Sequence, residues 1–197
     1  PQYSRAFPFT EGLAAVDIVG KMGYIDKTGQ VVIEPQFTVA GPFSEGLAAV
    51  ESGKKYGYIE KTGKMVVEPQ FEAADCFSEG LAAARASPGK GENWGRWGYI
   101  DRTGKWIIRP QFDDARAFSG GLAAVVVLEF VQFEKEKCGY IDRTGKMIIK
   151  PQLVFGGDFS EGLASMLVGG GLMEGGKLGY VDTVSYTHLR AHETVLD

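Results

Sequence analysis

The sequence predicts an all-β fold of tandem three-stranded repeats that stack as an open solenoid or superhelical meander. A motif close to FSEGLAAV occurs five times, beginning at Phe9, Phe43, Phe77, Phe118 and Phe159. Pro-Gln recurs at Pro35, Pro69, Pro110 and Pro151, so the repeat is 34 residues long and later copies carry an insertion of about seven. No window of the repeat carries a helical stripe over ten residues. A fixed period of this length is typical of stacked repeats, because one repeat cannot bury its apolar faces alone.

Each repeat contains three short segments that favour strands. In the second repeat they are residues 46–50, 56–60 and 64–69. Small Ala residues in the first segment let another layer approach closely. The third segment has three consecutive apolar residues, as in Val31-Val32-Ile33, which predicts burial on both faces. A closed propeller-like array is the alternative, and it would need a fourth strand that the Pro-Gln-Phe link could contain.

A turn signal joins the second and third segments of every complete repeat. Asp-Lys-Thr-Gly at 26–29 recurs as Glu-Lys-Thr-Gly at 60–63 and as Asp-Arg-Thr-Gly at 101–104 and 142–145. The acid can accept a hydrogen bond from the backbone N–H two residues on, and the glycine can take the positive φ that closes a hairpin. Turn geometry therefore explains Asp26, Glu60, Asp101 and Asp142. Catalysis is not expected of them, because a pair of catalytic carboxylates needs two unlike environments.

The acids of the FSEGL motif form a second recurring set. They are Glu11, Glu45, Glu79 and Glu161, and Gly120 stands at the same place in the fourth repeat. We expect these side chains to cap a turn or to face solvent. The glycine weakens any metal role shared by all repeats, and no cluster of carboxylates for calcium is evident.

One segment is long enough to compare with known repeats. Residues 96–125, RWGYIDRTGKWIIRPQFDDARAFSGGLAAV, resemble a full unit of the WG-repeat family, also called KWG repeats, found mostly in bacterial proteins. The resemblance covers about residues 1–183 and implies an all-β repeat scaffold that mediates interactions. The Trp-Gly pair is present as Trp97-Gly98. The other repeats place Met22, Tyr56, Cys138 and Leu178 at the Trp position, so we expect a buried apolar role there.

The period predicts two regions. Residues 1–183 form an array of about four and a half repeats that begins in the middle of a repeat, as expected of a fragment of a longer array. Residues 184–197 are predicted to be a non-native tail, because the period stops after Asp182 and the segment resembles translated sequencing-adapter read-through. Both histidines, His188 and His192, lie there, and no third metal ligand accompanies them.

Composition excludes several classes of function. The net charge of −4 disfavours a general nucleic-acid or anionic-membrane binder, and no apolar run of 18 residues could span a membrane. Two cysteines, Cys76 and Cys138, are too few for a disulfide scaffold and are predicted to be ordinary thiols. Nucleophilic catalysis is not expected, because residues 1–183 contain no histidine partner. We expect no cofactor and no enzymatic activity.

Two surfaces are candidates for binding. Insertions at residues 85–96, 126–137 and 167–177 fall at the same link, and their aromatic residues Trp94, Phe130 and Phe133 could anchor an unidentified protein partner. The alternative is that these insertions only lengthen hairpins. The second surface is a basic column at the hairpin tips, which could bind an anionic polysaccharide or similar polymer or could simply be solvated. It consists of Lys27, Lys61, Lys64, Arg102, Lys105, Arg143 and Lys146.

Overall fold

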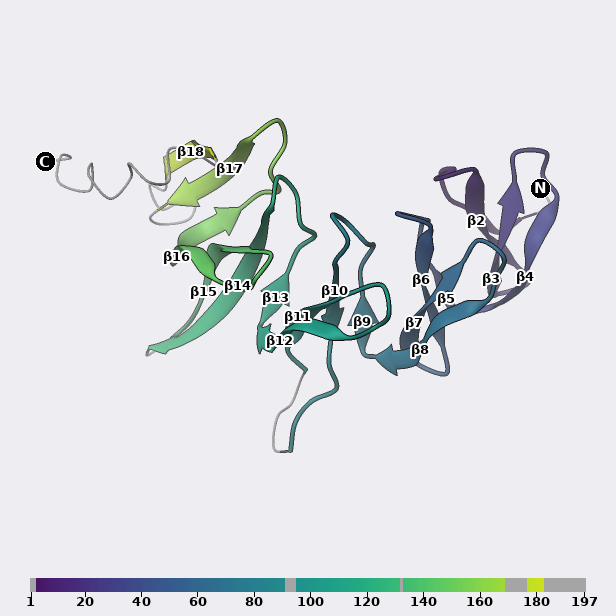
Figure 1. Ribbon diagram of the computed structural model, residues 1–197, viewed down its shortest axis with the longest axis horizontal. Coiled ribbons are helices and arrows are strands. Elements are labelled where there is room, and N and C mark those ends of the chain that lie inside the picture. Colours follow the sequence, from purple (N-terminus) through teal and green to yellow (C-terminus); the bar gives the residue numbers. More distant parts are fainter. Residues whose placement is uncertain (1–2, 91–94, 132, 169–176, 183–197) are drawn as a thin grey trace, which may run out of the picture. The chain divides into compact units, whose positions relative to one another are not determined.

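The computed structural model describes residues 3–90, 95–131, 133–168 and 177–182, and in these ranges all regular structure is β (Figure 1). The all-β prediction is confirmed. The strands form four small antiparallel sheets. The chain divides into two compact units, Pro1–Gln111 and Phe112–Asp197. The predicted tail, with His188 and His192, lies outside the described residues.

The first three sheets each contain four strands in simple meander order. Their members are β1 (Arg5–Ala6), β2 (Leu13–Ile18), β3 (Lys21–Asp26) and β4 (Val31–Phe37); β5 (Val39–Ala40), β6 (Leu47–Ser52), β7 (Lys55–Glu60) and β8 (Met65–Phe71); and β9 (Ala73–Ala74), β10 (Ala82–Arg85), β11 (Trp97–Ile100) and β12 (Trp106–Phe112). The prediction of three strands per repeat is therefore wrong. The additional strand has only two residues, paired in the second sheet as Val39↔Glu51 and Ala40↔Val50, and two residues are too few to show a periodic pattern.

The fourth sheet has six strands because one strand serves two repeats. Its order is β13 (Asp114–Ala115), β14 (Leu122–Val131), β15 (Phe133–Asp142), β16 (Met147–Gly156), β17 (Leu163–Val168) and β18 (Lys177–Asp182). Near its middle β16 pairs with β15 at Cys138↔Leu153, and at its end it pairs with β17 at Phe155↔Leu167. In the earlier repeats the equivalent stretch is broken after the Pro-Gln-Phe segment, as between β4 and β5.

A β-bulge explains why glycine and proline recur at fixed places. The register between β7 and β8 shifts from Tyr56↔Phe71 to Tyr58↔Val67, and Gly57 lies inside this shift. A Cβ on Gly57 would stand 2.4 Å from the carbonyl oxygen of Val67 and 2.8 Å from the nitrogen of Pro69. Only glycine allows this close approach, and a bulge tolerates a proline that cannot donate a ladder hydrogen bond. Gly23, Gly98 and Gly139 meet the same backbone atoms in their own sheets.

The expected burial of the third segment on both faces is wrong. Val31 is half-buried and Ile33 is buried, but Val32 between them is 45% exposed. Val66 and Ile107 occupy the same position in their sheets and are 42% and 47% exposed. Side chains alternate between the two faces of a strand, so the middle residue of the three must turn away from the core.

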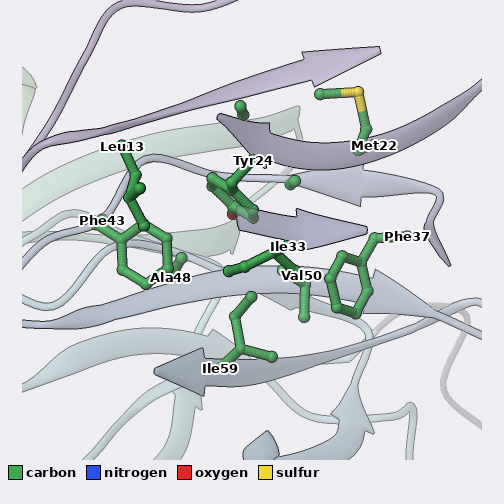
Figure 2. Packing of buried hydrophobic residues seen from close by; sticks show 11 residues of the cluster. Leu13, Met22, Tyr24, Ile33, Phe37, Phe43, Ala48, Val50 and Ile59 are labelled. Carbon is green, nitrogen blue, oxygen red and sulfur yellow. The ribbon is translucent and has the colours of Figure 1, made fainter. Parts of the chain in front are cut away.

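The core forms between successive sheets. One cluster joins Leu13, Met22, Tyr24, Ile33 and Phe37 of the first sheet and its turns to Phe43, Ala48, Val50 and Ile59 of the second (Figure 2). A second cluster joins the second and third sheets in the same way, with Tyr58, Val67 and Phe71 packed against Phe77, Ala82 and Ile100. Neighbouring repeats within residues 1–111 thus bury each other's apolar faces, as the repeat pattern predicts.

Candidate functional site

The hairpin tips of the three aspartates have the predicted geometry, whereas the Glu60 carboxylate accepts from the Thr62 hydroxyl at 2.7 Å. Oδ1 of Asp101 accepts hydrogen bonds from the backbone N–H of Thr103 (2.9 Å), the Thr103 hydroxyl (2.6 Å) and the backbone N–H of Lys105 (3.1 Å). Asp26 and Asp142 make the same three bonds in their turns. The glycine closing each of these turns has φ between 83° and 86°. Each carboxylate is thus committed to its own turn.

These hydrogen bonds stabilise the ionised form of the turn acids. The pKa of Asp26 and of Asp142 is lowered chiefly by the hydrogen bond from the threonine two residues on. The pKa of Asp101 is also lowered, although desolvation, its largest single influence, acts in the opposite direction. The tips therefore present charged carboxylates beside their basic residues at neutral pH.

Three tyrosines of the Gly-Tyr motif, Tyr24, Tyr58 and Tyr140, contact the repeat that follows their own. Tyr58 is fully buried, its ring lies 4.8 Å from that of Phe77, and its hydroxyl donates to the backbone carbonyl of Asp75 at 2.7 Å. Tyr24 repeats the arrangement with Phe43 and the carbonyl of Gly41, and Tyr140 with Phe159 and the carbonyl of Gly157. A buried hydroxyl needs such a partner. The recurring Phe and Tyr are therefore two halves of one inter-repeat contact.

The FSEGL acids make a second inter-repeat contact that the sequence analysis missed. The Glu45 carboxylate accepts from the backbone N–H of Gly80 at 3.1 and 3.2 Å and lies 3.8 Å from the Arg102 guanidinium. Glu11 does the same one repeat earlier, with the backbone N–H of Gly46 (3.0 Å) and the Lys61 ammonium (3.0 Å). The Lys61 hydrogen bond is the main cause of the lowered pKa of Glu11. The acid of one FSEGL turn thus contacts both the FSEGL turn and the hairpin tip of the next repeat.

Backbone conformation offers a signal for this role. Glu11, Glu45, Glu79 and Glu161 all have φ between 49° and 53°, and the glycine after each is also at positive φ. Two such residues in a row form the tight turn in which Asn-Gly or Gly-Gly is usual. A glutamate there is strained, so its recurrence indicates that its side chain contributes something a glycine would not.

The seven basic residues of the proposed column are placed at or beside the hairpin tips, in surface positions. Two of them, Lys61 and Arg102, are the partners of Glu11 and Glu45. Part of the positive charge at the tips is therefore paired with carboxylates inside the array.

The three aromatic anchors are placed only in part. Trp94 lies outside the described residues. Phe130 and Phe133 lie on β14 and β15, where the pairs Phe130↔Glu134 and Val131↔Phe133 continue the hairpin to its end, and their side chains lie outside the described portion. The fourth repeat's insertion therefore lengthens its hairpin, which was the alternative expected for the insertions.

Both cysteines are at least half-buried, and so is the residue at the Trp position in four of the five repeats. Cys76 and Cys138 are both unbridged, and burial raises the pKa of each thiol. Met22 and Cys138 are buried, and Tyr56 and Trp97 are half-buried, but Leu178 is 69% exposed. Leu178 lies on β18, which pairs on one side with β17, and the described residues include no strand on its other side.

Neither a metal site nor a membrane-spanning helix occurs in the described residues. In these ranges no three His, Cys, Asp or Glu side chains gather closely enough to hold a metal ion. The described portion also contains no helix with the length and hydropathy that a membrane crossing requires.

A row of exposed aliphatic residues was also missed. Val32, Val66 and Ile107 occupy the same position on β4, β8 and β12, all within residues 1–111. The signal was present in the sequence, because the middle of three apolar residues in a strand faces away from the other two.

The repeat model of one protein family matches the chain at residues 1–21, 22–56, 56–86, 97–128 and 139–171, under the description "WG containing repeat". The chain belongs to the WG-containing repeat family. The resemblance expected from residues 96–125 is thereby confirmed. The WG glycine is the bulge residue described above, and the Trp position beside it faces the core or its margin in the first four repeats.

Beyond the family, the similarity of the chain to known proteins is confined to its fold. No curated protein sequence matches the chain at a significant level. Among 20 solved chains with a similar fold, one is titled "Crystal structure of the eukaryotic initiation factor", with a TM-score of 0.51 and 10% sequence identity. That match covers 83% of this chain and 47% of the other, so the WG-repeat chain corresponds to about half of its length.

Proposed function

We propose that this WG-repeat chain is a non-catalytic scaffold that binds a protein partner through the edge carrying the long hairpin insertions. The observation that carries the proposal is the β14–β15 hairpin. Each of its strands has ten residues, against six in β6 and β7. Pairing continues without a break from Leu122↔Asp142 to Val131↔Phe133.

The composition of the added segment supports contact with a protein. Its pairs combine apolar or aromatic residues with charged ones, as in Leu128↔Glu136 and Phe130↔Glu134. Aromatic residues flanked by charge are common anchors of protein interfaces. Independently of the hairpin, residues 1–111 expose Val32, Val66 and Ile107, apolar surface of a kind that a protein partner could cover.

The absence of catalysis is part of the same proposal. The turn aspartates are held by their own turns, and Glu11 and Glu45 are held by the next repeat. Recurring acids that already satisfy structural contacts have no evident second role as acid–base pairs.

The decisive experiment compares a partner's binding to matched variants of the whole chain. Phe130→Ser with Phe133→Ser should remove the anchors without shortening the hairpin, and replacement of residues 128–136 by Asn-Gly should remove the extension. We expect a partner captured by the wild-type chain, then purified, to bind either variant at least tenfold more weakly. Lys64→Glu, at a hairpin tip of the second repeat, should leave its affinity unchanged. Equal affinity for the wild type and both hairpin variants would contradict the proposal.

The competing proposal is binding of an anionic polysaccharide or similar polymer along the basic hairpin tips. Basic residues recur at two positions of the turn, which favours this proposal: Lys27 and Arg143 before the Thr-Gly pair, and Lys64, Lys105 and Lys146 after it. The pairing of Lys61 and Arg102 with carboxylates weakens it. Heparin is a suitable probe, because a polymer bound through phosphate- or sulfate-like charges dissociates steeply as salt rises. Retention on heparin that falls with salt and is lost in a Lys64→Glu, Lys105→Glu variant would favour this alternative.

For the arrangement of the repeats we propose an open solenoid or superhelical meander, with a closed propeller-like array as the alternative. The matching Tyr24–Phe43 and Tyr58–Phe77 contacts support a constant step between repeats within residues 1–111, which both arrangements require. The fourth strand per sheet removes one objection to the propeller-like array. Small-angle X-ray scattering would separate an elongated array from a compact ring by its maximum dimension.

A further inference from the structure

The unit of the chain from residue 112 onward contains a pocket of about 150 Å³ beside Cys138. Residues of β13, β14, β15 and β16 line it. Its lining is mixed, with more polar than apolar surface accessible. It includes Asp114 and Arg116 together with Ala115, Ala124, Val126, Cys138 and Phe155.

The pocket lies where the third repeat places an indole ring. In that repeat Trp97 pairs with Arg85, whose guanidinium lies 5.8 Å from the centre of the Trp97 ring. In the fourth repeat the equivalent pair is Val126↔Cys138, so both large side chains are replaced by small ones.

A second replacement occurs on the neighbouring strand. The residue at the Trp position faces a phenylalanine in the first two sheets, as Met22↔Phe37 and Tyr56↔Phe71. Cys138 instead faces Leu153. Compared with the third repeat, all three positions carry smaller side chains, with Val126 for Arg85, Cys138 for Trp97 and Leu153 for Phe112.

The chemistry of the lining suits an aromatic group. Burial raises the pKa of Cys138 to about 11, so the thiol is uncharged at neutral pH and acts as an apolar surface. Arg116 lies over the Phe155 ring at 5.4 Å and 3.9 Å from Asp158. Phe155 is 42% exposed, so this side of the lining is accessible to solvent.

We propose that this pocket binds one aromatic ring of a small molecule of about the size of indole. A pocket of about 150 Å³ is large enough for a benzene-sized ring. The ring would lie against the Cys138 thiol and Val126, with Phe155 and the Arg116 guanidinium at its edge. The site is separate from the hairpin end proposed above to bind a protein, and it does not depend on that proposal.

The test uses the whole chain and 5-fluoroindole, observed by fluorine NMR. We expect saturable binding to the wild type and unchanged affinity in Cys76→Ser, whose thiol does not line the pocket. Cys138→Trp supplies the ring that the third repeat carries, and it should weaken binding at least tenfold. Val126→Phe fills the same space from β14 and should have the same effect if Cys138→Trp fails to fold.

A second measurement needs no substitution in the pocket. In the Cys76→Ser protein, saturating 5-fluoroindole should slow the alkylation of Cys138 by iodoacetamide at least threefold, because the ring covers the sulfur. The proposal is wrong if the wild type shows no saturable binding, if a folded pocket-filling variant binds as well as the wild type, or if the alkylation rate is unchanged.

Discussion

At the residue scale, the glutamate of the FSEGL motif shows how a strained backbone can be maintained by a contact elsewhere. Glu45 has φ of 52°, a conformation that costs a residue with a Cβ roughly 1 kcal/mol more than glycine. Its carboxylate accepts from the Gly80 N–H and pairs with Arg102 in the next repeat. The fourth repeat has Gly120 at this position, where φ is 61° and a glycine is unstrained.

The two opposing effects at Glu45 can be separated by two substitutions. Glu45→Ala loses the acceptor and keeps the strained Cβ, whereas Glu45→Gly loses the acceptor and relieves the strain. We expect the alanine variant to be less stable than the glycine variant by about 1 kcal/mol. Urea unfolding of both proteins measures the difference. An alanine variant as stable as the glycine variant would show that the positive φ carries no cost here.

Acidity offers a second prediction at this scale. The pKa values of Asp26, Asp101 and Asp142 are lowered in the folded chain, so these acids favour folding while they are ionised. That contribution is complete above the unfolded pKa of about 3.9, and it is lost as the pH falls through the lower folded pKa. Replacing all three with asparagine should therefore reduce the loss of stability between pH 7 and pH 3. The urea midpoint at the two pH values measures this, and an equal loss in both proteins would contradict it.

At the scale of the element, the bulge opposite Pro-Gln is the feature that most constrains each sheet. Gly57 has backbone atoms of Val67 and Pro69 where a Cβ would stand, and backbone cannot move aside as a flexible side chain can. Gly57→Ala should destabilise the protein by more than about 3 kcal/mol. Gly53→Ala is the matched control, because Gly53 has φ of 62° and nothing within 4 Å, and it should cost only about 1 kcal/mol. Thermal unfolding that ranks the two equally would exclude the steric explanation.

The elements also show which features were predictable from the sequence. The Asp-x-Thr-Gly turns were predictable, because turn chemistry is a local signal, and a longer fourth hairpin was one of the two outcomes expected for its insertion. The two-residue strands were not, since β5 forms only by pairing with Val50 and Glu51 on the far side of the next FSEGL turn. The exposed Val32 was misjudged because a run of apolar residues was taken as evidence of two buried faces.

Of the candidate sites, sequence alone could locate the insertions and the basic tips but not their contacts. Lys61 and Arg102 are partners of Glu11 and Glu45, which lie more than one full repeat earlier in the chain. Such pairing depends on the step from one repeat to the next, and no local pattern encodes it. The pocket beside Cys138 likewise required knowledge of which residues lie opposite one another across the strands.

At the scale of the molecule, stacking makes the stability of residues 1–111 depend on contacts between neighbouring repeats. In such arrays each repeat contributes its own stability and each interface adds a coupling term. The Tyr58 hydroxyl couples the second repeat to the third through the Asp75 carbonyl, and the Tyr58 ring packs on Phe77. Weakening this interface should therefore affect cooperativity as well as stability.

Tyr58→Phe tests that coupling with two spectroscopic probes. The substitution removes the hydrogen bond to the Asp75 carbonyl and should cost about 1 kcal/mol. All three tryptophans, Trp94, Trp97 and Trp106, lie in the third repeat, so their fluorescence reports that repeat while far-UV circular dichroism reports the whole chain. We expect the separation between the urea transitions seen by the two probes to be wider in the variant than in the wild type, because a weaker interface lets the third repeat unfold more independently. Gly53→Ala changes a turn within the second repeat at similar cost and should leave that separation unchanged, so a divergence of the same size in both variants would argue against interface coupling.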